Sequence, residues 1–354
     1  MSTASPYIQR AAQRDAAGDH DAAINELARG VRAGDLPSTR ALGLRLLTGN
    51  AAPLLPNEGL RFIGEAMQRG DAEAGARAAG VLALGVNRSP DWNLGLQWLM
   101  RSAAAGWPPA QQQVLALCDD RALANRESVA PSTPVNWQRL AAAVDLSSWR
   151  RVSPGQVLHA DPLVRCIPEF MRAELCACVV RHSQGRLQRA QLYDPVSRGN
   201  IVDPHRSNTQ ASFGVEEVDF VQALMQARIA VACGVDVRQL EAVAVLHYHP
   251  GEQIVDHYDF VDPDHTPDYA AEVARNGQRV ITFLLYLNED YEGGETQFPR
   301  LNIAYRGGIG DALIFVNALA DLSPDKRTLH AGRPPTRGEK WIVSQFIRSR
   351  PTRP

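Results

Sequence analysis

Three residues of the chain have the types and spacing of a metal centre with one open face: His257, Asp259 and His330. Two imidazoles and one carboxylate on one side of an Fe(II) ion leave the other side free for reaction. This arrangement distinguishes non-haem oxygenase sites from closed structural zinc sites. Because side chains alternate along an extended strand, His257 and Asp259 point the same way and can bind one ion. The triad therefore predicts an iron centre that performs oxygen chemistry.

A lysine downstream of the triad is placed to hold an anion. In the strand expected over 340–347, Lys340 and Phe346 share one face, by the same alternation of side chains. A lysine on an inward face is costly unless it meets a negative charge, so we expect Lys340 to bind a carboxylate. Arg337 remains open as the alternative, because a guanidinium can bind a carboxylate through two hydrogen bonds.

Strand signals surround all of these residues. Runs rich in β-branched and aromatic residues, bounded by Gly, Pro or Asn, cover 241–249, 279–288, 310–316 and 340–347, and a glycine-rich turn leads into a short extended piece over 292–299. Several short strands separated by turns predict a sandwich or jelly roll, with both metal-binding segments at one mouth of it. Gly293, Gly294 and Gly310 are expected at backbone positions with positive φ.

The order of these motifs resembles the prolyl 4-hydroxylase branch of the 2-oxoglutarate and Fe(II)-dependent dioxygenases. The similar positions span 163–348 and are Tyr248, Pro250-Gly251, His257-x-Asp259, Thr282, Tyr286-Leu287-Asn288, Gly293-Gly294-Glu295-Thr296, Phe298-Pro299, Gly310-Asp311, His330 and Gly338-x-Lys340-Trp341. The resemblance implies a double-stranded β-helix (jelly roll) core with flanking helices over 170–183 and 218–233.

The resemblance also implies a role for each site residue. The two histidines and the aspartate of the triad would ligate Fe(II), 2-oxoglutarate would chelate the iron through its keto acid end, and dioxygen would take the remaining position. Lys340 would pair with the far carboxylate of 2-oxoglutarate, and Tyr248 and Thr282 would hydrogen-bond to that carboxylate or near it. Ascorbate is the expected reductant.

The reaction implied by the family is oxidative decarboxylation of 2-oxoglutarate to succinate and carbon dioxide, coupled to hydroxylation of a C–H bond. We expect the target to be a prolyl residue of a peptide or protein. Two alternatives stay open: hydroxylation of a free amino acid or small peptide natural product, and a non-catalytic interaction protein that senses 2-oxoglutarate or iron.

Two residues bear on the substrate. The family commonly has a tryptophan where this chain has Phe346, and often carries a substrate-facing segment near Arg206. Both are expected as substrate contacts, although a plain structural salt bridge explains Arg206 equally well. His247 and His249 flank Tyr248 on the opposite strand face, so we expect them at the core edge or surface and not in the iron centre.

The N-terminal third of the chain repeats with an offset of 36 residues. The offset superimposes Ile24, Leu60 and Leu96, then Leu27, Ile63 and Leu99, then Gly34, Gly70 and Gly106. Helices are predicted over 59–69 and 95–105, with the glycines in left-handed conformation at helix ends. This pattern resembles tetratricopeptide repeats of the Sel-like subclass and predicts an α-solenoid of helix-turn-helix repeats. Docking of a peptide or protein partner and simple packing against the oxygenase both remain open as its purpose.

The chain is thus expected to be a multidomain α and β protein. The predicted parts are a helical repeat domain over 1–124, a linker and connecting helix over 125–150, and a dioxygenase domain over 151–354. A chain of 354 residues with 45% hydrophobic content is long enough to bury substantial cores.

Composition bounds the partners and the compartment. A net charge of −2 without a basic block gives no reason to expect nucleic acid as a partner. No apolar run reaches the length of a membrane span, and no apolar N-terminal region precedes the repeats. The five cysteines are expected to be reduced core thiols. Together these features predict a cytoplasmic protein that does not act at a membrane.

Overall fold

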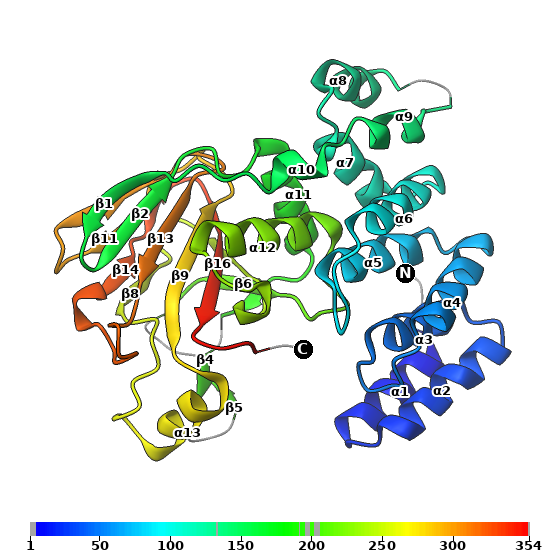
Figure 1. Cartoon of the computed structure of the whole chain (residues 1–354), viewed down its shortest axis with the longest axis horizontal. Helices are drawn as coiled ribbons and strands as arrows, with labels where there is room; N and C mark the ends of the chain where they lie inside the picture. The colour runs from blue at the N-terminus through cyan, green and yellow to red at the C-terminus, as the bar shows by residue number, and fades with distance from the viewer. Residues whose placement is uncertain (1–4, 132–133, 191, 195–198, 202–205, 353–354) are drawn as a thin grey trace. The chain divides into compact units, whose positions relative to one another are not determined.

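The chain is divided into two compact units in the computed structural model, which describes residues 5–131, 134–190, 192–194, 199–201 and 206–352 (Figure 1). Unit 1 comprises Met1–Leu146 and Gly214–Leu224, and unit 2 comprises Ser147–Phe213 and Met225–Pro354. The segment expected as a linker, 125–150, contains the end of one helix and two further short helices, and unit 1 continues through it to Leu146. Residues 132 and 133 of that segment lie outside the described residues.

Unit 1 is helical, and neighbouring helices along the chain pack on one another, α1 on α2, α3 on α4 and α5 on α6. Its helices are α1 (Pro6–Ala16), α2 (His20–Arg32), α3 (Leu36–Thr48), α4 (Pro56–Gln68), α5 (Ala72–Leu84), α6 (Trp92–Ala104), α7 (Pro108–Leu117), α8 (Arg121–Val129) and α9 (Trp137–Ala142). The predicted helices over 59–69 and 95–105 correspond to α4 and α6. A short helix, α10 (Leu146–Trp149), follows at the boundary between the units.

Helix ends in unit 1 repeat with the period found in the sequence. Asp35 and Asp71 each accept a hydrogen bond from the backbone N–H three residues on, at the N-termini of α3 and α5. Gly49 and Gly85 end the same helices in left-handed conformation. The predicted positive φ is confirmed at the glycine that follows each helix α2, α4 and α6, with 79° at Gly34, 102° at Gly70 and 91° at Gly106.

A segment from much later in the chain, Gly214–Leu224, completes unit 1. The ring of Phe220 is fully buried and meets Trp92 of α6 edge to face, with ring centroids 5.8 Å apart. The buried amide of Gln113 in α7 donates to Asp219 Oδ2 at 3.3 Å. The helical unit therefore depends on a segment that is distant in sequence from its own helices.

Unit 2 contains two main antiparallel sheets. An eight-stranded sheet has the order β1-β2-β13-β9-β16-β7-β6-β3, and a four-stranded sheet has the order β12-β11-β14-β8. Two-stranded pairs β10-β15 and β4-β5 complete the described strands. The strands are β1 (Gln156–Ala160), β2 (Leu163–Ile167), β3 (Gln188–Arg189), β4 (Leu192–Asp194), β5 (Gly199–Ile201), β6 (Thr209–Ser212), β7 (Ala244–Tyr248), β8 (Ile254–His257), β9 (Arg279–Tyr286), β10 (Glu292–Gly293), β11 (Thr296–Phe298), β12 (Ile303–Tyr305), β13 (Ala312–Val316), β14 (His330–Gly332), β15 (Pro335–Arg337) and β16 (Lys340–Arg348).

The helices of this part of the chain are α11 (Ala173–Gln184), α12 (Phe220–Cys233), α13 (Pro267–Asn276) and the short 3₁₀ turns Val237–Gln239 and Lys326–Thr328. The division between the units falls within α12, after Leu224. The predicted helices over 170–183 and 218–233 correspond to α11 and α12. The predicted strands over 241–249, 279–288, 310–316 and 340–347 correspond to β7, β9, β13 and β16.

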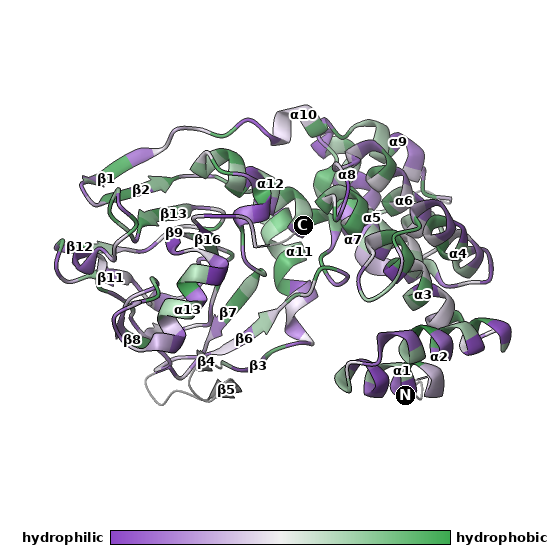
Figure 2. Ribbon diagram, turned by 60° about the horizontal axis from the view of Figure 1, so that its bottom comes forward, coloured by the Kyte–Doolittle hydropathy of each residue, from purple (hydrophilic) through white to green (hydrophobic). Residues whose placement is uncertain are grey.

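A hydrophobic core joins the two sheets. Phe298 of the four-stranded sheet packs in one cluster with residues of the larger sheet, which include Tyr248, Tyr286, Phe315 and Ile342. Figure 2 shows the hydrophobic residues along β2 and β13, two strands that contribute to this cluster. The core is therefore built by the inward-facing residues of both sheets.

Alternation along β16 separates an inner from an outer face, as the sequence predicts. Ile342 belongs to the core between the sheets, whereas Gln345, of opposite parity, accepts a hydrogen bond of 3.1 Å from Gln226 of α12. The predicted positive φ is likewise confirmed at Gly293, Gly294 and Gly310, which have 69°, 72° and 85°. Among the described residues, no helix has the length and apolar character needed to cross a membrane.

The fit of Gly214–Leu224 on α5 gives a test of unit 1. A Cβ on Gly80 would lie 2.0 Å from the carbonyl oxygen of Val218, so Gly80→Ala is expected to lower the free energy of unfolding by about 1–3 kcal/mol. The matched control is Gly64→Ala in α4, where the nearest atom, of Trp98, is 3.7 Å away. That control should stabilise by about 0.5–1 kcal/mol. Urea unfolding measures both; equal stabilisation by the two substitutions would contradict the seating of this segment on α5.

Candidate metal centre

The three predicted ligands come from neighbouring strands of the small sheet. His257 is the last residue of β8, His330 is the first residue of β14, and the two are directly paired across the antiparallel ladder. Their ring centroids are 4.3 Å apart. Asp259 follows β8 by two residues, and its side chain reaches both rings. Strand pairing thus brings together residues that are far apart in the sequence.

The distances suit a single ion. Asp259 Oδ1 lies 3.4 Å from His257 Nε2, and Asp259 Oδ2 lies 3.3 Å from His330 Nε2. One ligand atom from each residue falls within 4.8 Å of the others. Asp259 and His330 are buried, whereas the side chain of His257 is 32% exposed. The cluster therefore has a closed side and a side toward solvent.

In both histidines, Nδ1 contacts a backbone carbonyl, and Nε2 is the nitrogen available to a metal ion. His257 Nδ1 is 2.8 Å from the carbonyl oxygen of Val255, and His330 Nδ1 is 3.0 Å from that of Thr328. A proton on each Nδ1 donates to its carbonyl and leaves the lone pair of Nε2 for a metal. Both Nε2 atoms face Asp259. The residues present therefore fit an Fe(II) ion bound by two neutral imidazoles and one carboxylate.

The electrostatics keep the aspartate in its binding form. Burial alone would raise the pKa of Asp259, but the imidazoles of His330 and His257 hold it well below its usual value. Burial alone would lower the pKa of His330, but the carboxylate of Asp259 outweighs it and raises that pKa. The carboxylate is ionised at neutral pH and available to a cation.

Asp259 is oriented by a chain of hydrogen bonds from the larger sheet. Thr282 Oγ1 of β9 donates to Asp259 Oδ2 at 2.7 Å, and Asn317 Nδ2 donates to Thr282 Oγ1 at 2.8 Å. Thr282 was expected at the 2-oxoglutarate carboxylate or near it, and in the structure its hydroxyl contacts Asp259, a candidate metal ligand. Asn317 was not found from sequence, because an asparagine just past a strand end has no pattern that marks it as the partner of a distant threonine.

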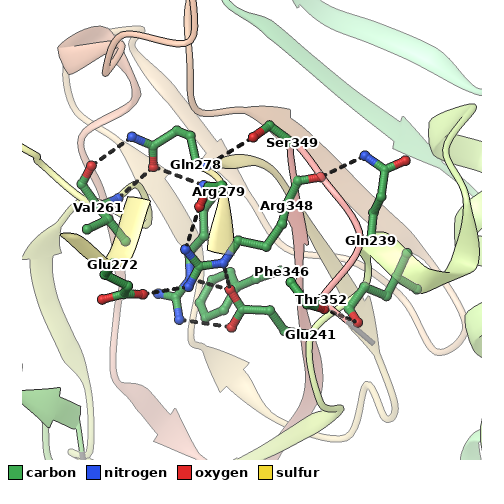
Figure 3. A network of polar contacts seen from close by, with 12 residues as sticks. Gln239, Glu241, Val261, Glu272, Gln278, Arg279, Phe346, Arg348, Ser349 and Thr352 are labelled. Carbon is green, nitrogen blue, oxygen red and sulfur yellow. Dashed lines mark hydrogen bonds and ion pairs between the residues drawn. The ribbon is translucent and has the colours of Figure 1, made fainter. Parts of the chain in front are cut away.

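The loop after Asp259 is also fixed, by a glutamine (Figure 3). Gln278 Oε1 accepts from the N–H of Val261 at 2.9 Å, and Gln278 Nε2 donates to the carbonyl of Val261 at 2.7 Å. Val261 lies two residues beyond Asp259. The amide of Gln278 therefore holds the backbone that carries the aspartate.

Next to this glutamine lies a partly buried network of charged side chains (Figure 3). Glu241 accepts hydrogen bonds from Arg279, with Nε at 2.8 Å, and from Arg348. Burial alone would raise the pKa of Glu241, but the two guanidinium groups outweigh it and keep it below its usual value. The guanidinium of Arg279 also lies 4.0 Å from the ring centroid of Phe346. Phe346 is paired with Thr282, is half-buried, and is held in place by this network.

Lys340 lies at the start of β16, with its side chain inside the core. It is 1% exposed, and Nζ donates to the carbonyl oxygen of Gly294 at 2.7 Å. The ring centroids of Tyr248 and Tyr286 lie 5.3 and 5.6 Å from Nζ. Burial lowers the pKa of Lys340 to about 7. A buried ammonium whose charge is so disfavoured is suited to an incoming anion.

The alternative anchor, Arg337, has a different environment. Its side chain is 79% exposed and pairs with Glu292 of the neighbouring strand β10. Tyr248, in contrast, is 1% exposed and directly opposite Lys340 in the ladder between β7 and β16, and burial raises its pKa. Lys340 and Tyr248 therefore share the interior of the two-sheet core, whereas Arg337 lies at the surface.

Arg206 is engaged in local contacts. Its guanidinium donates to Asn208 Oδ1 and Gln210 Oε1, each at 2.9 Å, and its backbone bridges to Ile254 of β8. These contacts are structural, although they place Arg206 beside the strand that ends in His257. His247 and His249, as expected, do not join the triad; with Glu339 they form a separate cluster that the sequence did not reveal.

Part of the chain is similar in sequence to known proteins. Residues 243–348 match the model of the 2OG-Fe(II) oxygenase superfamily. Probable prolyl 4-hydroxylase 9 of Arabidopsis thaliana is 29% identical over 215 residues, which cover 55% of this chain and 72% of that protein. Prolyl 4-hydroxylase 1 of the same plant is 29% identical over 214 residues, which cover 56% and 72%.

Among solved structures, the viral collagen prolyl hydroxylase of Paramecium Bursaria Chlorella virus-1, in its 2OG complex, is 25% identical. The alignment covers 53% of this chain and 96% of that one, with a TM-score of 0.41.

The bond from Thr282 to Asp259 can be removed without changing the three candidate ligands. Thr282→Val deletes the donor and leaves the amide of Asn317 without its acceptor, so metal affinity is expected to fall by about 10–100-fold. Thr282→Ser keeps the hydroxyl and is the matched control, with affinity close to that of the natural chain. Titration of metal-free protein with Co²⁺ measures both. Equal affinities for the Val and Ser variants would show that this hydrogen bond does not orient Asp259.

Proposed function

We propose that this chain, which carries a 2-oxoglutarate and Fe(II)-dependent oxygenase domain with prolyl 4-hydroxylases among its homologues, hydroxylates a prolyl residue of a peptide or protein. The substrate C–H, 2-oxoglutarate and dioxygen are converted to C–OH, succinate and carbon dioxide. The observation that carries the proposal is the convergence of His257, Asp259 and His330, together with a buried lysine in the same two-sheet core. The prolyl target is supported by the relatives named above.

Each residue of the candidate site has a separate role in this proposal. His257, Asp259 and His330 would hold the iron, which when bound supplies the site for activation of dioxygen. Thr282 keeps the carboxylate of Asp259 directed at both imidazoles. Lys340 would bind the far carboxylate of 2-oxoglutarate, and Tyr248 faces the same space. These protein groups bind and orient the reactants in advance, which lowers the entropic cost of reaction.

We assign the substrate side to the end of the core where Phe346 lies. Phe346 is half-buried, pairs with Thr282, and is backed by Arg279. An aromatic ring paired with Thr282, which contacts Asp259, suits the compact, apolar ring of a prolyl residue. Arg206, tied to neighbouring side chains near β8, would border the entrance.

The finer architecture is part of the proposal. We regard the two main sheets of unit 2 as a double-stranded β-helix. Both are antiparallel, and residues of both sheets form one hydrophobic core. We regard unit 1 as a solenoid of tetratricopeptide-like repeats. Two recurring features support this proposal. The helix N-caps Asp35 and Asp71 are 36 residues apart, and so are the left-handed glycines Gly49 and Gly85, which end the same helices.

Unit 1 also offers a place for a protein partner. A cavity of about 420 Å³ has apolar lining at Ile8, Ala41 and Leu44 and charged groups at Arg40 and Glu216. A peptide that carries the target proline would dock there in part. The neighbouring surface of α5, α6 and α7 is already filled by Gly214–Leu224.

We place the reaction in the cytoplasm. All five cysteines are free thiols, and Cys118, Cys166, Cys176 and Cys178 are buried, which agrees with a reducing compartment. Ascorbate would serve as reductant, as the family implies. Neither a nucleic acid nor a membrane is part of the proposal.

The role of Lys340 gives a quantitative prediction. A charge-assisted contact is worth about 1.5–3 kcal/mol, so Lys340→Ala should raise the 2-oxoglutarate concentration for half-maximal succinate release by about 10–100-fold. Arg337→Ala, the exposed control, should leave it unchanged. Because burial lowers the pKa of Lys340 to about 7, the free lysine is neutral at higher pH. Affinity for 2-oxoglutarate should therefore fall as pH rises above 7, with proton uptake on binding. The reverse ranking of the two variants would assign the anchor to Arg337.

The proposed function is tested by succinate release from the full chain with Fe(II), ascorbate and 2-oxoglutarate. Proline-containing peptides are compared with the same peptides carrying alanine at the proline, and with free proline and other amino acids. We expect stimulation by the proline peptides alone, with gain of one oxygen atom on the proline by mass spectrometry. Asp259→Ala should abolish turnover.

Other outcomes of this experiment contradict the proposal. Stimulation by free amino acids alone would assign a small-molecule hydroxylase. Binding of 2-oxoglutarate without turnover on any substrate, including protein from cell extract, would assign a sensor. Turnover that persists in Asp259→Ala would contradict the assignment of the metal centre.

A further inference from the structure

A second group of potential metal ligands lies where β7 ends and β16 begins, separate from the candidate iron centre. His247 Nε2 is 3.0 Å from Glu339 Oε2, and His249 Nδ1 is 3.2 Å from Glu339 Oε1. One ligand atom of each residue lies within 4.8 Å of the others. The two histidines are spaced i, i+2 in the sequence, and the carboxylate comes from the residue just before β16.

The strand alternation puts this group on the outer face of the large sheet. Tyr248 between the two histidines belongs to the core between the sheets, so His247 and His249 face away from it. His247 is paired with Thr209 of β6 on one side and Trp341 of β16 on the other. The cluster and the iron centre are therefore on different sides of the same sheet.

One ligand of the cluster is preorganised. The side chain of His247 is 5% exposed, and its ring lies 4.2 Å from that of Trp341, centroid to centroid. Its Nδ1 is 3.2 Å from the hydroxyl of Thr209. A proton on Nδ1 that donates to this hydroxyl leaves the Nε2 lone pair directed at Glu339. This is the arrangement in which an outer partner fixes the tautomer of a metal-binding histidine.

We propose that His247, His249 and Glu339 bind a zinc ion. Imidazole nitrogen and carboxylate oxygen are zinc ligands with bonds of about 2.0–2.2 Å, and in a tetrahedral site such atoms lie about 3.3 Å apart. The two nitrogen–oxygen distances of 3.0 and 3.2 Å are close to this value. His249 and Glu339 are half exposed, which leaves the fourth position to water.

Zinc at this site would join two strand ends that also contribute to the oxygenase pocket. Tyr248 lies between the two histidines, and Lys340 follows Glu339 directly. Their side chains face the core, whereas the cluster faces outward. The bound ion would fix the end of β7 to the start of β16 where Tyr248 and Lys340 are paired. We assign it a positioning role, outside the reaction itself. The assignment is independent of the substrate proposed above.

Without a metal, an N–H group of each imidazole would donate a hydrogen bond to the carboxylate of Glu339. The two alternatives differ in the stoichiometry of metal binding. The chelator-treated full chain should bind two Zn²⁺ ions, one in each site, as measured by calorimetric titration. His257→Ala combined with His330→Ala should retain one, at the outer site.

Variants of the cluster identify the second ion. His249→Ala removes a half-exposed ring, and Glu339→Gln keeps the shape of the side chain but removes its charge. Each should weaken the outer site by at least about 100-fold, since a lost ligand costs more than the roughly 10–100-fold of an outer partner. Thr209→Val should weaken it by about 10–100-fold. Glu292→Gln, an exposed glutamate outside the cluster, is the matched control and should still bind two.

Two results would overturn the zinc site. One is a single Zn²⁺ per natural chain that His249→Ala and Glu339→Gln retain with full affinity. The other is the loss of all Zn²⁺ binding in the chain lacking His257 and His330, provided that its circular dichroism shows it folded. If that double variant fails to fold, the comparison of the natural chain with Glu339→Gln decides the matter by itself.

Discussion

The pairing of β8 with β14 is the constraint on which the metal centre depends, because it sets His257 directly opposite His330. Each ring is oriented within its own segment, by the carbonyl two residues earlier. Asp259 is oriented from the other sheet, through Thr282 of β9. The two histidines are paired within the small sheet, whereas Asp259 also receives a hydrogen bond from the large sheet. This dependence explains why a site of three side chains needs a scaffold of two sheets.

Three cationic side chains in the β-sheet region of unit 2 differ in their partners. Arg279 and Arg348 are both matched by Glu241, and the carboxylate stays ionised despite its burial. Lys340 has the carbonyl of Gly294 as its hydrogen-bond acceptor, and burial lowers its pKa to about 7. A buried ammonium whose pKa is lowered by burial is costly for the folded protein and would be stabilised by an incoming anion. In our proposal, 2-oxoglutarate supplies the anion that stabilises the charge of Lys340.

Three consecutive residues at the end of β7 face alternate sides of the large sheet. Tyr248 turns into the core opposite Lys340, and His247 and His249 turn outward to Glu339. The same alternation operates in β16, where Ile342 faces the core and Gln345 faces α12. In unit 1, consecutive helices pack on one another, and the distant segment Gly214–Leu224 adds the buried ring of Phe220. Alternation of side chains along strands thus determines the faces of the large sheet, and a segment distant in sequence completes the helical unit.

The sequence by itself determined the local features of this protein. Alternation along the strands predicted the inner and outer faces of β16, helical periodicity predicted α4 and α6, and positive φ was predicted at Gly34 and Gly293, because each depends only on nearby residues. Residue type and spacing also picked out the triad.

The tertiary structure decided which side chains are buried and which residues distant in sequence are in contact. Lys340 is buried, whereas Arg337 is exposed. The hydroxyl of Thr282 donates a hydrogen bond to Asp259. A separate cluster contains His247, His249 and Glu339. Spacing in the sequence fixes the direction of a side chain, but only the packed chain fixes which distant group it meets.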